Sequence, residues 1–274
     1  MKKLTLLLLT AISLQLNGCA TTTQDSVSGV NRSQLMLLPA SQVVAMSSQS
    51  YTQTLQESQK KNTLNTDKVQ LERVRTISNR LIAQVGVFRP DAVQWKWEVN
   101  VDKSDQVNAY CMPGGKIMVL TGLIDQLKAT DDELAAVIGH EIAHALREHG
   151  RERMSQAYVQ QFGLQALGAI LTNGTSAAVG NASMQAASVG SQLFFALPNS
   201  RLQETEADRI GLELSARAGY NPDAAITLWQ KMGKLSGNKP SEFFSTHPSD
   251  STRIAELQKL VPKVKPLYEA AKKR

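Results

Sequence analysis

The stretch with the clearest chemical potential is His140-Glu141-Ile142-Ala143-His144, which has the pattern H-E-x-x-H. The residues before it read as an α-helix, and positions four apart on a helix lie on one face. Two imidazoles on one helical face can bind one metal ion, and the glutamate beside the first can accept a proton from a water molecule. Because the chain has only four histidines, chance is a poor explanation for this pair around a glutamate.

A catalytic zinc site of this kind needs a third protein ligand. His149 lies nine positions beyond His140, about 180° around a continuous helix, so it is interpreted as a structural residue. The better candidates lie on a helix predicted at residues 201–218, with acidic residues at 204, 206 and 208. Glu204 and Asp208 are one turn apart, so one carboxylate can bind the metal while the other accepts a hydrogen bond from a ligating histidine.

The elements that must position these residues form an α+β fold that is predominantly helical, with a small β-sheet beside the H-E-x-x-H helix. Apolar spacing predicts helices at residues 41–61, 67–85, 122–128 and 201–218, and strands at residues 95–101, 107–112 and 116–120. The residues from Thr130 to Glu133 fit a capping box, which marks the start of the metal-binding helix. Gly139, just before the first histidine, is expected to let a neighbouring element approach closely.

The N-terminus is typical of a bacterial lipoprotein. Two lysines precede an apolar run at residues 4–16, which is too short to span a bilayer. The run ends in L-N-G-C, which resembles a lipoprotein cleavage site despite its unusual asparagine, and Cys19 would be the lipidated first residue. Residues 1–18 are therefore interpreted as a signal peptide, with an ordinary secretory signal as the alternative. Ala20 favours the outer membrane if the organism is Gram-negative.

Charge and composition disfavour some classes of function and indicate how the chain is organised. The net charge of +6 falls to +4 without Lys2 and Lys3, with 28 basic against 24 acidic residues, which is too mild and scattered to indicate nucleic-acid binding. Residues 19–34 are rich in Thr, Ser, Gln and Asn and predict a flexible tether, followed by one domain at residues 35–274. Residues 162–197 are too polar to span a membrane; we expect two small-residue helices joined near 173–175 that pack on the domain or move as a lid.

Together with Thr246-His247-Pro248-Ser249, these motifs resemble the M48 family of zinc metallopeptidases, in particular its Oma1-like members and its lipid-anchored bacterial members. The run N-A-Y-C-M-P-G-G at residues 108–115 is similar to the strand and turn that precede the metal-binding helix in that family. The resemblance covers roughly residues 67–260, which is most of the chain after the signal peptide.

The resemblance implies that one zinc ion per chain is bound by His140, His144 and Glu204. It selects Glu204 over Glu206, a choice that spacing alone leaves open. It also implies that Glu141 is the general base and that Asp208 is the carboxylate that holds a ligating histidine.

Further residues gain roles from the same resemblance. His247 is expected near the metal, where it either steadies the oxyanion or acts as a reversible fourth ligand that keeps the enzyme latent. A strand bordering the cleft is expected to receive an extended substrate, and its residues are Asn108, Ala109, Tyr110, Cys111, Met112 and Pro113.

The sequence therefore predicts a lipid-anchored zinc endopeptidase of the bacterial cell envelope, on the periplasmic side of the outer membrane. Its expected substrates are extended or misfolded envelope proteins, as in protein quality control, and its expected contact with the membrane is through Cys19. The alternatives are an envelope chaperone or assembly factor with a structural or latent metal site, and, with less support, a zinc hydrolase of cell-wall peptides. Oligomeric state is not indicated.

Overall fold

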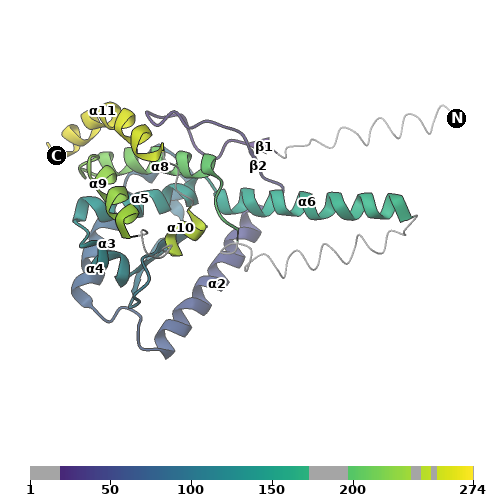
Figure 1. The fold of residues 1–274 in the computed structure, drawn as a ribbon, viewed down its shortest axis with the longest axis horizontal. Coiled ribbons are helices and arrows are strands. Elements are labelled where there is room, and N and C mark those ends of the chain that lie inside the picture. The colour runs from purple at the N-terminus through teal and green to yellow at the C-terminus, as the bar shows by residue number, and fades with distance from the viewer. Residues whose placement is uncertain (1–18, 173–196, 236–241, 248–251, 274) are drawn as a thin grey trace.

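The computed structural model describes residues 19–172, 197–235, 242–247 and 252–273 (Figure 1). The predicted signal peptide and the greater part of the small-residue region, including the expected helix junction near 173–175, lie outside the described residues. The two-stranded N-terminal ribbon consists of β1 (Cys19–Ala20) and β2 (Gln34–Leu35), which pair antiparallel.

Helix α5 (Asp131–Leu146) is the central element and carries the H-E-x-x-H sequence. Its start is the predicted capping box: Thr130 Oγ1 accepts a hydrogen bond from Glu133 N at 3.2 Å, and Glu133 Oε2 accepts one from Thr130 N at 2.9 Å. From Glu133 to Leu146 every side chain of the helix is buried. A helix that is covered on all sides has little freedom to rotate, so the direction of its two histidines is fixed by packing.

The predicted sheet is present, with three strands in the order β3–β5–β4. Strand β3 (Glu98–Asp102) runs parallel to β5 (Lys116–Leu120), and β4 (Ala109–Met112) runs antiparallel to it. The turn between β4 and β5 uses Gly114 and Gly115 at φ of 82° and 84°, a left-handed conformation that glycine adopts without strain. Strand β4 is an edge of this sheet, and its neighbour across the core is α5.

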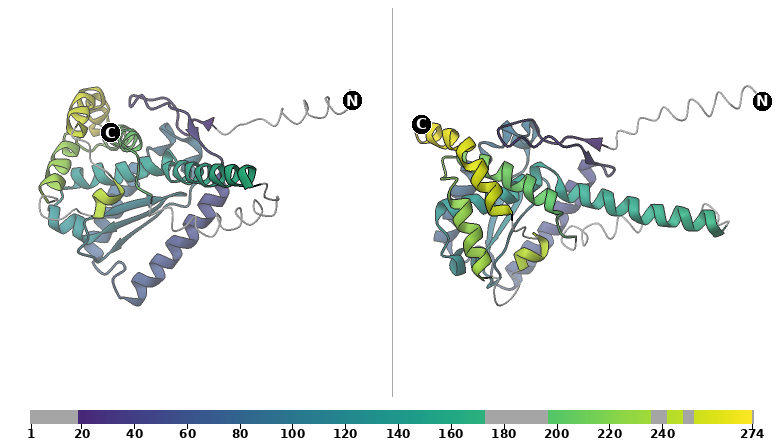
Figure 2. Two further views of the ribbon diagram at one scale, coloured as in Figure 1. Left: turned by 45° about the vertical axis from the view of Figure 1, so that its right-hand side comes forward. Right: turned by 45° about the horizontal axis from the view of Figure 1, so that its top comes forward.

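Helices cover both faces of the sheet (Figures 1 and 2). Helix α5 lies between β4 and α8 (Arg201–Arg217), so the metal-binding sequence is enclosed from two sides. Helix α2 (Ala40–Lys60) lies against the opposite face, where Tyr51 Oη donates a hydrogen bond of 2.6 Å to Ile117 O. The remaining helices of the described residues are α3 (Lys68–Ile82), α4 (Thr121–Leu127), α6 (His149–Thr172), α9 (Ala224–Leu235), α10 (Glu242–Thr246) and α11 (Arg253–Lys272), with short 3₁₀ turns at Val85–Val87 and Pro90–Gln94.

Helix α6 runs unbroken to Thr172 and extends well away from the body of the molecule (Figure 1). None of the helices in the described part of the chain combines the length and the apolar character needed to cross a bilayer.

The segment expected to be a flexible tether is instead packed against the body over residues 19–35. Thr23, Ser28, Val30 and Gln34 are buried there. Gln34 Nε2 donates a hydrogen bond of 2.7 Å to Arg147 O, at the end of α5. The polar composition that suggests a tether supplies hydrogen-bonding groups that are satisfied by the body of the protein, rather than by water.

Candidate metal centre

The crossing of α5 and α8 brings the two halves of the site together. The helices approach so closely that a Cβ added to Gly139 would lie 2.8 Å from Ser215 Oγ, and one added to Gly211 would lie 2.7 Å from His140 N. The close approach expected at Gly139 is therefore present, and its partner is a second glycine. This backbone contact places the acidic start of α8 beside the histidines of α5.

Four side chains converge at this crossing: His140, His144, Glu204 and His247 each offer a ligand atom, all within 4.8 Å of one another. His140 Nε2 lies 3.0 Å from His144 Nε2 and 3.3 Å from Glu204 Oε2. His144 Nε2 lies 3.3 Å from Glu204 Oε1. All four side chains are buried, so their mutual geometry is set by the protein rather than by solvent.

The spacing of these atoms fits a tetrahedral metal ion. Metal–nitrogen bonds of about 2.0–2.1 Å place neighbouring tetrahedral ligands about 3.3 Å apart. Glu204 Oε2 is a buried oxygen without a hydrogen bond, although His140 Nε2 and Arg253 Nη1 lie 3.3 and 3.4 Å away. A buried carboxylate oxygen that faces imidazole nitrogens without a hydrogen bond is the arrangement expected of a metal ligand.

Glu141 faces the cavity beside the cluster. Its Oε1 is buried without a hydrogen bond and lies 3.6 Å from His247 Nε2. The cavity has a volume of about 70 Å³, which is room for a few water molecules. Its wall also includes Asn199, whose Nδ2 lies 3.2 Å from His247 Nδ1. A water molecule in this cavity would be within reach of both Glu141 and the ligand cluster.

The edge strand β4 forms one wall of the same cavity. Of the six residues expected to border the cleft, five line it: Asn108, Ala109, Tyr110, Cys111 and Pro113. Met112 does not, because its side chain points to the opposite face of the sheet and packs with Tyr51 and Met118. Tyr110, which is on the same side of the strand as Met112, also packs against that cluster, although it lines the cavity as well.

The ligand His140 is held from behind by a carboxylate. Its Nδ1 lies 2.9 Å from Asp208 Oδ1, one turn along α8 from Glu204. Arg253 Nη2 donates a hydrogen bond of 2.6 Å to the same oxygen, and the guanidinium stacks over the Trp229 ring at 3.3 Å. Sequence reasoning does not identify Arg253, because the motifs contain no position that marks it.

The ligand His144 is contacted from behind by another histidine. Helix α5 ends at Leu146, and Glu148 adopts a left-handed φ of 51°, which interrupts the helical path before α6 begins at His149. The interruption turns His149 back toward the site, so that its Nδ1 lies 2.8 Å from His144 Nδ1. The expectation that His149 lies on the far side of a continuous helix is therefore wrong, although His149 is outside the cluster of candidate ligands.

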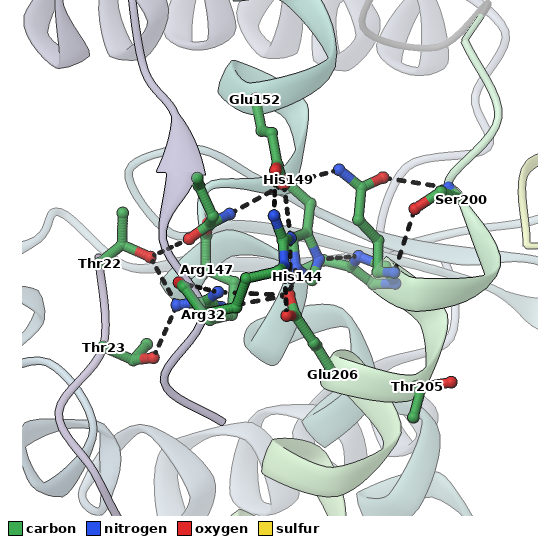
Figure 3. Close-up of polar contacts among 12 residues, drawn as sticks. Thr22, Thr23, Arg32, His144, Arg147, His149, Glu152, Ser200, Thr205 and Glu206 are labelled. Carbon is green, nitrogen blue, oxygen red and sulfur yellow. Dashed lines mark hydrogen bonds and ion pairs between the residues drawn. The ribbon is translucent and has the colours of Figure 1, made fainter. Parts of the chain in front are cut away.

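Behind His149 lies a dense polar network that joins α5, α6, α8 and the N-terminal segment (Figure 3). His149 Nε2 lies 3.0 Å from Glu206 Oε2. Arg32 donates to Glu206 through Nε at 2.8 Å and to Glu152 through Nη1 at 2.5 Å. Arg147, whose side chain is fully buried, also lies 3.3 Å from Glu206. Glu206 is thus an outer carboxylate of the site, whereas Glu204 faces the ligand cluster.

The electrostatics of the cluster follow from its burial. Burial disfavours the charged form of His140, but the neighbouring carboxylates of Asp208 and Glu204 outweigh this and raise its pKa to about 9. Burial lowers the pKa of His144 well below its usual value. Burial opposes ionisation of Glu204, yet the neighbouring histidines hold its pKa well below the usual range. Burial raises the pKa of Glu141. An ionised carboxylate between imidazoles is a donor set that suits zinc.

The sequence also matches known proteins. The model of peptidase family M48 matches residues 68–261. The mitochondrial metalloendopeptidase OMA1 of Arabidopsis thaliana is 42% identical over 57% of this chain and 30% of its own length. The beta-barrel assembly-enhancing protease of Yersinia pestis is 28% identical over 70% of this chain and 39% of its own length.

The metalloprotease LoiP of Escherichia coli is 29% identical over 94% of this chain and 96% of its own length. By contrast, the chain spans only about a third to a half of the length of the mitochondrial relatives. The match to the family model begins at the start of α3 and includes the whole ligand cluster.

Proposed function

Because the chain belongs to peptidase family M48, we propose that it is a zinc-dependent endopeptidase that cleaves extended or misfolded polypeptides. The observation that carries this proposal is the convergence of His140, His144 and Glu204 beside Glu141, which points into the same cavity. A zinc ion held by these ligands would supply Lewis-acid chemistry, which lowers the pKa of a water molecule and polarises a peptide carbonyl.

The protein's own groups would carry the proton transfers. Glu141 is placed to take the proton from the attacking water and to pass it to the nitrogen of the leaving amine, as general acid–base catalysis requires. Its unpartnered Oε1 supports this role, because the oxygen is not committed to another hydrogen bond. Asp208 would orient His140 and keep its Nε2 directed at the ligand cluster.

The edge strand β4 supports an extended substrate. Strand edges carry unpaired N–H and C=O groups that can pair with another chain. In this protein the edge strand lies along the cavity that contains Glu141. A peptide that binds as a further strand would place its backbone, rather than a particular side chain, beside the cluster. This favours selection for unfolded polypeptide over selection for a sequence.

His247 would act as a reversible fourth ligand. Its Nδ1 lies 3.0 Å from Glu204 Oε1 and 3.4 Å from His140 Nε2, within the ligand cluster. A histidine in the fourth position of a catalytic zinc site excludes the water molecule that the reaction needs. The proposed enzyme is therefore latent until His247 moves away. The alternative role, in which His247 steadies the oxyanion, requires it to remain in place during cleavage.

We place this activity in the bacterial cell envelope, on the periplasmic side of the outer membrane, with the chain anchored through a lipidated Cys19. The support is the N-terminal sequence and the printed name of the Yersinia relative, which refers to beta-barrel assembly. If Cys19 carries the lipid anchor, the substitution Cys19→Ala should move the protein from the membrane fraction to the soluble fraction of cell extracts. A variant that stays in the membrane fraction contradicts the lipid anchor without touching the peptidase proposal.

The activity is tested with Glu141→Gln, assayed for zinc content and for casein cleavage with and without a chelator. We expect one zinc per chain in both proteins, and cleavage only by the wild type without chelator. The matched control is Glu133→Gln, a buried glutamate at the other end of the same helix, which should retain cleavage. If Glu141→Gln cleaves casein as wild type does, the proposed base is wrong. If Glu141→Gln supports cell growth as well as wild type does, while deletion of residues 162–197 does not, the chaperone alternative is favoured.

A further inference from the structure

We propose that His149 and Glu206 are positioning residues for His144, holding this ligand through two hydrogen bonds in series. The proposal rests on the proposed function, because it assumes that His144 binds a metal through Nε2. The two residues lie outside the ligand cluster and do not line the cavity, so neither can touch a substrate or the reacting atoms.

The direction of each hydrogen bond follows from the ligand role of His144. A neutral imidazole that gives its Nε2 lone pair to a metal carries its proton on Nδ1. His144 Nδ1 then donates to His149 Nδ1 at 2.8 Å. His149 must accept on Nδ1 and so carries its own proton on Nε2, which donates to Glu206 Oε2 at 3.0 Å. The series ends at the Glu206 carboxylate. Each of the two hydrogen bonds then has one ring nitrogen that donates and one partner atom that accepts.

Packing holds this series in place. The rings of His144 and His149 meet edge to face, with centroids 4.9 Å apart and an interplanar angle of 72°. His149 is fully buried and Glu206 nearly so, and buried polar groups lose much of their stabilisation when a partner is removed. The ring of His149 therefore fixes the rotation of the His144 ring as well as its tautomer.

The carboxylate at the end of the series is itself fixed by arginines. Arg32 of the N-terminal segment contacts both of its oxygens, at 2.8 Å for Oε1 and 3.1 Å for Oε2. Arg147 approaches Oε2 at 3.3 Å from the end of α5 (Figure 3). These contacts keep Oε2 directed at His149.

The other histidine ligand, His140, is held by a carboxylate directly, without an intervening residue. Its Nδ1 meets Asp208 Oδ1 directly at 2.9 Å. No carboxylate of α8 contacts Nδ1 of His144 directly, because the ring of His149 lies between that atom and Glu206. His149 spans that gap, and the helix interruption at Glu148 is what places it there. Each ligating histidine is thereby connected to a carboxylate of α8, His140 directly and His144 through His149.

The experiment compares Glu206→Gln, His149→Gln and the double variant with Glu213→Gln. Glu213 is the matched control, because it is a fully buried glutamate of the same helix that also holds the N-terminal segment, through Ser26 and Ser28. For each purified full-length protein, the zinc Kd is measured by competition with a chromophoric chelator, and urea unfolding is measured on the metal-free form. Long-range ¹H–¹⁵N spectra of the zinc-loaded wild type report which ring nitrogen of each histidine carries the proton.

If the proposal holds, both single variants bind zinc about 10- to 100-fold more weakly than wild type. Glu213→Gln keeps the wild-type Kd even where it lowers the stability of the metal-free protein. The zinc Kd of the double variant is at most about twofold higher than that of the single variant with the higher Kd, because the effects of residues in one series are not additive. The spectra place protons on His144 Nδ1 and His149 Nε2.

Equal zinc affinity in Glu206→Gln and Glu213→Gln overturns the proposal, as does a proton on His149 Nδ1. Those outcomes leave the proposed peptidase intact if wild type still binds one zinc and cleaves casein. A wild-type protein that binds no zinc removes the proposed function and, with it, this inference.

Discussion

Gly139 of α5 and Gly211 of α8 face each other where the two helices cross, and neither position has room for a side chain. A Cβ on Gly211 would lie 2.7 Å from the backbone nitrogen of His140 and 2.8 Å from its Cα. Glu204 and Asp208 reach His140 only because α8 lies this close to α5. The glycine contact is therefore a condition for assembling the ligand cluster, although neither glycine carries any chemistry.

The first prediction concerns this contact. We expect Gly211→Ala to push α8 away from α5, because backbone atoms cannot move aside as a flexible side chain can. The free energy of unfolding should fall by about 1–3 kcal/mol, as for other overpacked positions. The zinc Kd should rise as well, because the displacement separates Glu204 from the histidines. Urea unfolding and chelator competition measure the two effects.

Gly233→Ala is the control for that variant. Gly233 lies in α9, and a Cβ there would meet nothing within 4 Å. Alanine in place of an exposed helical glycine stabilises by about 0.5–1 kcal/mol, so this variant should be at least as stable as wild type, with the same zinc Kd. If Gly211→Ala behaved in the same way, the close crossing would not be what positions Glu204.

The sequence was sufficient to predict those parts of the site that depend on local periodicity. The face shared by His140 and His144 follows from a repeat of four on a helix, and the start of α5 follows from the capping box at Thr130. Glu204 and Asp208 are one turn apart for the same reason. Their meeting with α5 is a tertiary contact, and spacing alone did not separate Glu204 from Glu206. Only the resemblance to a known family made that choice.

The remaining features depend on contacts that periodicity does not encode. Glu148 adopts a left-handed conformation, but glutamate is not a residue type that signals one, so the sequence does not predict the return of His149 to the site. Residues 19–34 have the composition of a tether, and the partners of Ser28, Arg32 and Gln34 in the folded protein explain why they are packed. Composition reports which groups a segment offers and does not report what will satisfy them.

The second prediction concerns Arg32. Its side chain is about 30% exposed and lies between Glu152 and Glu206, which are both buried. We expect Arg32→Gln to lower the free energy of unfolding by about 1–3 kcal/mol, because each carboxylate loses a charged hydrogen-bond donor while remaining buried. Arg75→Gln removes a comparable but exposed ion pair with Glu72 and should cost less than about 1 kcal/mol. Equal costs for the two variants would show that the N-terminal segment is not held by this contact.

The third prediction concerns pH and Glu133. Burial opposes ionisation of Glu133, but Lys231 and the hydrogen bonds from Thr130 and Thr227 outweigh it, so its pKa is lowered on folding. A lowered pKa stabilises the folded protein above the unfolded pKa, and this contribution is lost as the pH falls through the folded pKa. Between about pH 6 and pH 3, the wild type should therefore lose more unfolding free energy than Glu133→Gln. Urea unfolding at several pH values tests this, and parallel losses in the two proteins would contradict it.

The fourth prediction separates the two roles of His247. As a fourth ligand, His247 contributes to metal affinity and blocks the position that water needs, so His247→Ala should bind zinc more weakly and, at saturating zinc, cleave casein faster than wild type. If His247 instead steadies the oxyanion, His247→Ala should leave zinc affinity unchanged and slow cleavage, typically by about 10²–10³-fold in kcat for the loss of such a donor.

The position of His247 favours the first outcome. Its Nδ1 lies 3.4 Å from His140 Nε2 and 3.0 Å from Glu204 Oε1, which are atoms of two candidate ligands. Asn199, whose Nδ2 lies 3.2 Å from the same nitrogen, provides the comparison, since Asn199→Ala should loosen His247 and change both the zinc Kd and the cleavage rate in the same directions as His247→Ala, by smaller amounts.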